Sequence, residues 1–377
     1  MIDPPFPDTI CPGYRFGFSR VRTGKMWCSA TLFRKTGHGK LHERSFYKTA
    51  NEEIQMPRVL SGIQPSGTLH IGNYFGMMKP MIESQHSSEL FCFIVNYHAL
   101  TTVEDPEKLR VNTIEAAIDF LALGLDPDKC CFWAQSDIPE VQELTWLLSC
   151  QTSLGLCERS HSYKDKLAKG LPATAGLFSY PVLMAADILM MQANIVPVGK
   201  DQKQHLEITR DIAIRFNHVY GDTFTIPEPR IDDNVAVIPG LDGQKMSKSY
   251  GNTIEIFEEE KSLRKKIMSI KTDSTPVEEP KNPETCNLFA LYKLIASADR
   301  INDMAKRYRA GGMGYGAVKT ELFETMRDYF KPYRERRVEL AGNKDKVRAT
   351  LRMGAEKARA IAMKTIITAR ERVGLNY

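Results

Sequence analysis

The feature that most constrains the fold is a regular alternation of apolar runs and helical patterns, which begins at Arg58. The apolar runs, expected to be buried strands, are RVLSGI (58–63), ELFCFIVNYHAL (89–100), CCFWAQS (130–136) and ANIVPVG (193–199). Helical patterns follow them at 72–85, 105–125, 139–154 and 201–221, and Asp105 and Pro106 supply an N-cap and a first helical residue. This rhythm predicts an α/β fold in which helices cover both faces of a parallel sheet.

After about residue 252 the strand patterns stop, and the remaining segments are all helical in pattern. They cover 257–270, 286–298, 299–310, 315–342 and 344–373. In the last segment an apolar stripe recurs at steps of three or four residues, formed by Leu351, Ala355, Ala358, Ala362, Ile366 and Ala369. We therefore expect an α/β domain over 56–252 and a C-terminal all-helical domain over 253–377.

Residues 1–55 differ from the rest of the chain. They hold nine Lys and Arg against five Asp and Glu, with early prolines and no helical period. The segment lacks the apolar core of a secretory signal, so we expect a disordered extension, or a start codon assigned too early with Met26 and Met56 as alternatives. An organelle transit peptide is a further alternative, against which Asp3 and Asp8 count.

Charge is unevenly distributed along the chain. The formal net charge is +5, but residues 291–377 alone carry 20 Lys and Arg against 10 Asp and Glu. A basic helix face is usually only solvated, yet a tail this polarised also suits the phosphate backbone of RNA. No 18-residue apolar run exists to span a membrane, and the eight cysteines form no CxxC pair, which favours reduced thiols in a cytosolic protein over a zinc site.

A glycine-rich turn, SGIQPSGTLHIGN (61–73), leaves the first strand and opens a helix. Gly62, Gly67 and Gly72 let the backbone approach a ligand closely, and the helix start directs amide N–H groups at it. His70 and Asn73 on the first turn are able to donate hydrogen bonds to phosphate. Alone, such a turn is more often a structural connector than a nucleotide site.

A second motif, GQKMSKSYGN (243–252), places Lys245 and Lys248 in a polar loop. Together with His-Ile-Gly-Asn at 70–73 it resembles the HIGH and KMSKS signatures of the class I aminoacyl-tRNA synthetases. KMSKS matches at every position, and HIGH departs only at Asn73. The Asn form within SGIQPSG and IGNY is typical of tryptophanyl-tRNA synthetases of the bacterial and organellar type. YPVLMAADIL (180–189), VPVGKDQKQHLEITRDIAIRFN (196–217) and FTIPEPRI (224–231) extend the resemblance, which runs from 56 to about 374.

The resemblance implies a Rossmann-like catalytic domain and a helical anticodon-binding region. The implied enzyme joins L-tryptophan to ATP, releases pyrophosphate, and transfers tryptophan to tRNA(Trp). Mg²⁺ is expected to bind through the ATP phosphates, with no protein metal ligands. The enzyme is expected in the cytoplasm, or in an organellar matrix if 1–55 is a transit peptide, with no membrane or DNA partner.

The resemblance also assigns roles to residues. The catalytic set is His70, Asn73, Lys245 and Lys248. The ATP-binding set is Gln64, Pro65, Ser66, Gly72, Asn73, Lys166, Gly199, Lys200, Asp201, Val237, Lys245, Met246, Ser247, Lys248 and Ser249. The tryptophan-binding set is Asp187, Tyr180, Met184, His98, Gln202, Val196 and Val198. Here Asp187 would accept the indole N–H. His70 departs from the Thr frequent in bacterial tryptophan enzymes, which bears on phosphate contacts and not on the reaction.

A homodimer is also expected, because the helix predicted at 139–154 is apolar on more than one side. Its apolar residues are Val141, Leu144, Trp146, Leu147, Leu148 and Leu154. Burial within one subunit is the alternative. Arg334, Arg336 and Arg337 are expected to face tRNA.

Three other functions are compatible with parts of the sequence. A tyrosyl-tRNA synthetase shares the fold and both signatures, but SGIQPSG, IGNY and MAADIL together disfavour it. A small-molecule adenylyltransferase generally lacks KMSKS and a basic helical region. A catalytically silent RNA-binding paralogue does not need Lys245, Lys248 and Asp187, which are all present.

Overall fold

The computed structural model describes residues 30–32, 44–46, 56–65, 67–160, 163–164, 168, 170, 172–199, 202–230 and 238–377. The chain divides into two compact units, Met1–Met56 and Pro57–Tyr377. In the first unit, β1 (Ala30–Leu32) and β2 (Arg44–Phe46) pair antiparallel. The other residues of 1–55 lie outside the described residues. The expectation that this segment is disordered therefore stays a prediction.

The second unit is built on a parallel sheet. Among the described residues its strands are β3 (Arg58–Ile63), β4 (Glu89–Ile94), β5 (Cys130–Ala134), β6 (Ile195–Pro197) and β7 (Glu228–Arg230), in the order β5-β4-β3-β6-β7. The four predicted strands are confirmed. The second ends earlier than expected, at Ile94, and α3 (Asn96–Ala99) follows it. The edge strand β7 was not predicted.

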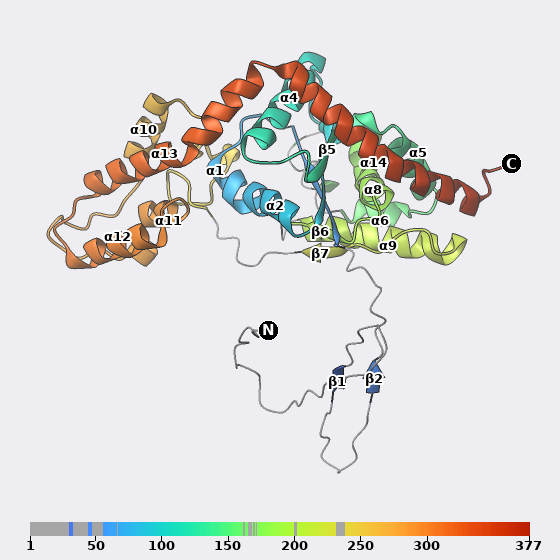
Figure 1. Ribbon diagram of the computed structural model, residues 1–377, viewed down its shortest axis with the longest axis horizontal. Coiled ribbons are helices and arrows are strands. Elements are labelled where there is room, and N and C mark those ends of the chain that lie inside the picture. The colour runs from blue at the N-terminus through green and yellow to red at the C-terminus, as the bar shows by residue number, and fades with distance from the viewer. Residues whose placement is uncertain are drawn as a thin grey trace, which may run out of the picture. The chain divides into compact units, whose positions relative to one another are not determined.

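The strand order reverses at β3. From β3 the chain adds β4 and then β5 on one side, and later adds β6 and β7 on the other. Ligands of open parallel sheets bind beside such a reversal, outside the carboxyl ends of the strands. The glycine-rich turn leaves β3 at this place (Figure 1).

Helices cover both faces of the sheet, as the alternation predicted. Val59, Cys92 and Phe132 face a core formed with α4 (Pro106–Ala122) and the C-terminal helices. Leu60, Phe93 and Trp133 face the other core. The helices on that side are α5 (Glu140–Ser149), α8 (Ala175–Met190) and α9 (Lys203–Tyr220). The predicted α/β fold with a helical C-terminal region is confirmed.

Two predicted helices have different bounds in the structure. The helix expected at 139–154 is split into α5, which ends at Ser149, and α6 (Leu154–Glu158). The segment expected as one helix at 72–85 is a series of short elements. They are α1 (Ile71–Asn73), a π-helical turn η1 (Tyr74–Met78), α2 (Lys79–Glu83) and a 3₁₀ turn η2 (Ser84–His86).

The C-terminal helices match the predicted segments. They are α10 (Glu260–Ser269), α11 (Asn287–Lys293), α12 (Ala298–Ala310), α13 (Tyr315–Ala341) and α14 (Lys344–Val373). The stripe predicted on α14 is buried at every position. Among the described residues, no helix is both long and apolar enough to cross a membrane.

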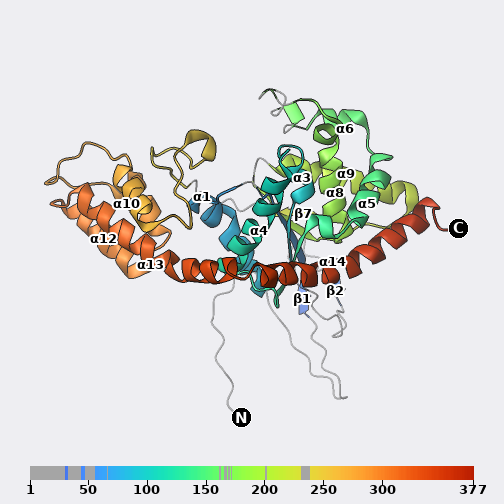
Figure 2. The same ribbon diagram turned by 90° about the horizontal axis from the view of Figure 1, so that it is seen from above.

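The last helix returns to the sheet. In Figure 2, α13 and α14 run end to end along one side of the unit, and α14 passes beside β5 and α5. Gly354 marks the crossing, since its backbone O accepts a hydrogen bond from Cys131 Sγ at 3.0 Å. Residues 57–377 thus pack as one unit, and the expected boundary at 252–253 does not separate their cores.

Candidate active site

The HIGN turn is a reciprocally capped helix start. His70 is the N-cap of α1; its Nδ1 accepts from Asn73 N, and Asn73 Oδ1 accepts from His70 N, both at 3.2 Å. Burial, with a smaller contribution from Lys248, lowers the pKa of His70 to about 4. The ring is therefore neutral at pH 7. Because Nδ1 accepts, the proton lies on Nε2, which leaves a donor for an anion.

Backbone hydrogen bonds join the glycine-rich turn to the segment that directly follows the KMSKS motif. Ile71 N donates to Ile254 O at 2.9 Å, and Ile256 N donates to Leu69 O at 3.0 Å. The KMSKS loop thereby lies over the glycine turn. A Cβ added to Gly67 would lie 3.9 Å from Lys248 Nζ, and one added to Gly72 would lie 3.3 Å from Met246 Cβ.

Asn252 organises the KMSKS loop. Its side chain accepts from Ser247 N at 2.8 Å and donates to Asp242 Oδ1 at 2.7 Å and to Lys245 O at 3.1 Å. Asn252 is buried, and Met246 is anchored in the core beside it. Lys245 and Lys248 are exposed on this fixed base. Desolvation lowers the pKa of Lys248, although Glu255 raises it.

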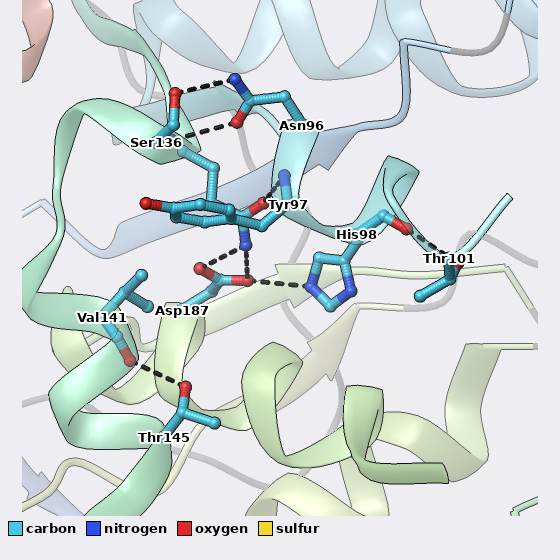
Figure 3. A network of polar contacts seen from close by, with 9 residues as sticks. Asn96, Tyr97, His98, Thr101, Ser136, Val141, Thr145 and Asp187 are labelled. Atoms are coloured by element: carbon cyan, nitrogen blue, oxygen red, sulfur yellow. Dashed lines mark hydrogen bonds and ion pairs between the residues drawn. The ribbon is translucent and has the colours of Figure 1, made fainter. Parts of the chain in front are cut away.

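A second polar cluster surrounds Asp187 on α8 (Figure 3). Gln135 Nε2 donates to both carboxylate oxygens, at 2.9 and 2.8 Å, and His98 Nε2 lies 3.1 Å from Oδ2. Tyr97 N in turn donates to Gln135 Oε1 at 2.9 Å. Burial raises the pKa of Asp187, whereas the hydrogen bonds from His98 and Gln135 lower it.

An aromatic side chain packs on His98, and apolar side chains lie on the same face of the sheet. The Tyr180 ring lies edge-to-face with His98, with centroids 6.1 Å apart, and its hydroxyl is hydrogen-bonded to His205 Nε2. Met184, Val196 and Val198 belong to the hydrophobic cluster on this face of the sheet. A buried acceptor among apolar walls suits a flat apolar ligand that carries one donor.

Comparison with known proteins agrees with this geometry. The family of class I tRNA synthetases (W and Y) matches residues 52–331. The chain belongs to this family. A tryptophan–tRNA ligase of Fusobacterium nucleatum is 54% identical over 321 residues, covering 85% of this chain and 98% of the relative.

Solved structures extend the similarity of this synthetase to the fold. A tryptophanyl-tRNA synthetase from Campylobacter jejuni complexed with ADP and tryptophan is 54% identical, with a TM-score of 0.81. It covers 84% of this chain and 99% of the neighbour. The enzyme from Mycoplasma pneumoniae is 31% identical with a TM-score of 0.73, covering 85% and 98%. The resemblance predicted from the two motifs is confirmed.

Several predicted site residues of the synthetase lie outside the described residues. They are Ser66, Lys166, Lys200, Asp201 and Val237. Gly199 follows β6, and Gln202 directly precedes α9. Ser247 and Ser249 hydrogen-bond each other at 2.8 Å.

Gln64 and Pro65 line a cavity of about 220 Å³ behind the glycine turn. Arg337 of α13 closes it, with Nε 2.6 Å from Asp119 Oδ1 and Nη2 2.7 Å from Glu115 Oε2. Two carboxylates of α4 hold Arg337, which is still partly exposed, so the expectation that it faces tRNA stays a prediction. Arg334 is half-buried and donates to Arg327 O.

Sequence reasoning missed Gln135, Asn252 and His205. Gln135 directly follows an apolar run that becomes a buried strand, so its place at the carboxyl end of the sheet was a usable signal. Asn252 ends the quoted KMSKS segment, but nothing in a single sequence marks it as the centre of the loop. His205 pairs with Tyr180 from a different helix, a contact that only the fold brings about.

Proposed function

We propose that the chain is a tryptophan–tRNA ligase. It activates L-tryptophan with ATP to tryptophanyl-adenylate and pyrophosphate, and then transfers tryptophan to tRNA(Trp). The buried Asp187 carboxylate carries this proposal, because the chain belongs to a family whose members select tryptophan or tyrosine, and a buried acceptor suits the indole N–H. Its relatives at 54% identity are tryptophan–tRNA ligases.

Asp187 suits an indole. A carboxylate accepts about four hydrogen bonds, and the donations from Gln135 and His98 leave room for the indole N–H. Phenylalanine has no donor there, so its binding would leave acceptor capacity unpaired in a desolvated site, which a polar pocket penalises strongly. Tyr180, Met184, Val196 and Val198 form the walls, and Gln202 holds the tryptophan ammonium.

Activation is attack of the tryptophan carboxylate oxygen on the α-phosphorus of ATP, which breaks the bond to pyrophosphate. The nucleophile is already an anion, so no general base is required. The protein aligns two anions and stabilises the charge that grows on the leaving group. We assign this stabilisation to Lys245, Lys248, His70 and Asn73.

We assign the remaining ATP contacts by the family pattern. Gln64, Pro65 and Ser66 are assigned to line the ATP, Gly72 and Lys166 to bind its phosphates, Gly199, Lys200 and Asp201 to bind its adenosine end, and Val237 to pack by the adenine. In the described part of the chain, no three His, Cys, Asp or Glu side chains are grouped to hold a metal ion. We expect Mg²⁺ to be carried by the ATP phosphates, whose charge it neutralises.

The test of function is ATP–pyrophosphate exchange with tryptophan, tyrosine and phenylalanine in turn, followed by charging of a bacterial tRNA(Trp) transcript. We expect exchange with tryptophan alone, and charging of that tRNA. Exchange with tyrosine would instead favour a tyrosyl enzyme. RNA binding without exchange would favour a silent paralogue.

We further propose a homodimer that acts in the cytoplasm, with the helical region 253–377 reading the anticodon. Of the apolar side chains expected at the dimer surface, Val141, Leu144, Leu147 and Leu148 are buried within the unit. Trp146 and Leu154 remain 69% and 70% exposed, which leaves apolar surface for a second subunit. Sedimentation is expected to show a dimer that Trp146→Ser with Leu154→Ser dissociates; a stable, active wild-type monomer would exclude this.

A further inference from the structure

A hollow of about 550 Å³ lies where the starts of α4 and α14 meet the carboxyl end of β5. Four cationic side chains line it: Arg110 from α4, and Lys344, Arg348 and Arg352 from α14. Glu107 and Asp137 are the acidic residues among its described lining. We call this hollow the α4–α14 groove. The residues assigned above to ATP and tryptophan are not among that lining.

Two residues of the groove lining adjoin the polar cluster around Asp187 (Figure 3). Asn96 and Ser136 line the groove and are joined by two hydrogen bonds, at 2.8 and 3.0 Å. The next residue of one segment is Tyr97, and the preceding residue of the other is Gln135, which holds Asp187. In both segments, a residue that lines the groove is therefore the direct neighbour of a residue of the Asp187 cluster.

The cationic side chains of the groove form only weak ion pairs with protein carboxylates. Arg110 pairs with Glu107 at 2.7 Å and Arg348 with Asp345 at 2.8 Å, both three residues apart on an exposed helix face. Lys344 lies 3.1 Å from Glu115. Exposed pairs of this kind contribute about 0–1 kcal/mol, so a phosphate is able to replace the carboxylate.

Cations farther along α14 are engaged differently. Arg359 pairs with Glu140, whose side chain is only 11% exposed, and Arg370 binds Glu143 through two nitrogens. Both carboxylates belong to α5, so these two arginines fasten α14 to α5. Arg359 and Arg370 therefore have a structural role that the cations of the groove do not share.

Lys344, Arg348 and Arg352 recur at steps of four residues, on one face of α14. Their backbones span about 12 Å along the helix axis, which exceeds the reach of one phosphate group. A row of cations along an open groove fits a polyanion with regularly spaced charges. We propose that the α4–α14 groove binds the sugar-phosphate backbone of tRNA. This rests on the proposed function, which supplies tRNA as the polyanionic substrate.

The test uses the full chain carrying Arg348→Ala and Arg352→Ala together. We expect the Kd for a bacterial tRNA(Trp) transcript to rise about tenfold. The slope of log Kd against log salt should fall by about 1.4–1.8, as expected for two lost phosphate contacts. Tryptophan-dependent pyrophosphate exchange and the midpoint of thermal unfolding should stay at wild-type values.

Two further variants control for charge and for folding. Lys364→Ala removes an exposed cation from the same helix outside the groove, and tRNA binding should be unchanged. Arg348→Lys with Arg352→Lys keeps both charges, and its Kd should remain within about twofold of wild type. If the alanine variant is unstable, the tRNA affinities of Arg348→Gln and Arg348→Lys are compared instead. The Gln variant, which loses one charge, should bind tRNA more weakly than the Lys variant.

Unchanged tRNA affinity and salt slope in the alanine variant would overturn the proposal. A parallel fall of exchange and charging would also overturn it, because the arginines would then act on the fold or on activation. Inorganic phosphate at constant ionic strength should leave tRNA affinity unchanged; a loss of affinity would reveal a small-anion site. If wild type lacks exchange, the proposed function fails, whereas the affinities of the variants still report on the groove.

Discussion

At the scale of residues, the site depends on buried polar side chains that are fixed by one another. Asp187, Gln135, Asn252 and His70 are all buried, and each has a hydrogen-bond partner within the site. Buried polar groups are costly without partners. These pairings therefore hold the binding groups in position before substrate arrives.

Asp187→Ala should raise the KM for tryptophan in pyrophosphate exchange and leave the KM for ATP near the wild-type value. Losing a hydrogen bond to a charged group costs about 1.5–3 kcal/mol, roughly 10- to 150-fold in affinity. Asp211→Ala, at an exposed position on α9, is the matched control and should change neither constant. An unchanged tryptophan KM would remove Asp187 from the pocket.

His70 should make stability depend on pH. Its pKa is about 4 in the folded protein, against about 6.5 when unfolded. The unfolded chain therefore binds the proton first, and the stability contributed by neutral His70 is lost as pH falls from about 6.5 to 4. Asp119 acts in the opposite sense: its pKa is raised to about 6 by burial, so its contribution is lost as pH rises from about 3.8 to 6.

His70→Thr separates the two contributions, because Thr keeps an N-cap oxygen but does not titrate. We expect the free energy of unfolding of wild type, relative to that of His70→Thr, to decrease as pH falls from 7 to 4.5. Urea unfolding at several pH values measures it, with the exposed His218→Thr as the matched replacement. The same shift in both variants would show that the HIGN turn is not its source.

At the scale of elements, one side chain organises the KMSKS loop, and one glycine sets how closely α14 approaches the sheet. Asn252 holds the loop through three hydrogen bonds. Gly354 lets α14 approach β5, since a Cβ there would lie 1.8 Å from Phe132 O. The first set of contacts fixes the loop from within, and the second contact sets a C-terminal helix against the sheet.

Asn252→Ala should raise the KM for ATP while the Kd for tryptophan stays near wild type. The change leaves Ser247 N and Lys245 O without their partner, at about 1–3 kcal/mol, and frees the loop that carries both lysines. Equilibrium binding and exchange kinetics measure the two constants. Asn282→Ala removes a comparable cap on Glu284 N away from the loop and should leave the KM for ATP unchanged.

Gly354→Ala should lower the free energy of unfolding by about 1–3 kcal/mol, because an added methyl group has no space against strand backbone. Gly316→Ala on α13 is the matched control, since nothing lies within 4 Å of its Cβ position. It should raise stability by up to about 1 kcal/mol through helix propensity. Denaturant unfolding compares them; equal effects would contradict the close approach at Gly354.

Elements with a strong internal pattern were predictable from the sequence. Buried strands such as β4 and β5 are apolar runs, and α14 carries an apolar stripe. β7 is short and has charged ends and a central Pro229, so it lacked any strand signal. The apolar stripe of α14 predicted a helix with one buried face. It did not predict which elements cover that face, because periodicity carries no information about them. Similarly, the two motifs indicated the phosphate site, whereas Gln135 reaches Asp187 only through the fold.

At the scale of the whole molecule, the sheet, the site and the C-terminal helices form one unit, Pro57–Tyr377. A chain that begins at Met56 should therefore keep tryptophan-dependent exchange, because β3 starts only at Arg58. Exchange rates and unfolding midpoints of the full and shortened chains make the comparison. An insoluble or inactive product would show that residues 1–55 are needed for folding.

The position of α14 also bears on how the protein is made. β5 ends at Ala134, but the helix that covers its free edge ends only at Val373. At about 5–20 residues per second, a ribosome needs roughly 12–48 s to synthesise the intervening chain. Throughout that interval the nascent polypeptide presents an unpaired strand edge of the kind that templates aggregation. Yield in cells should thus depend on chaperone supply, and ribosomes that stop before residue 344 should release insoluble product.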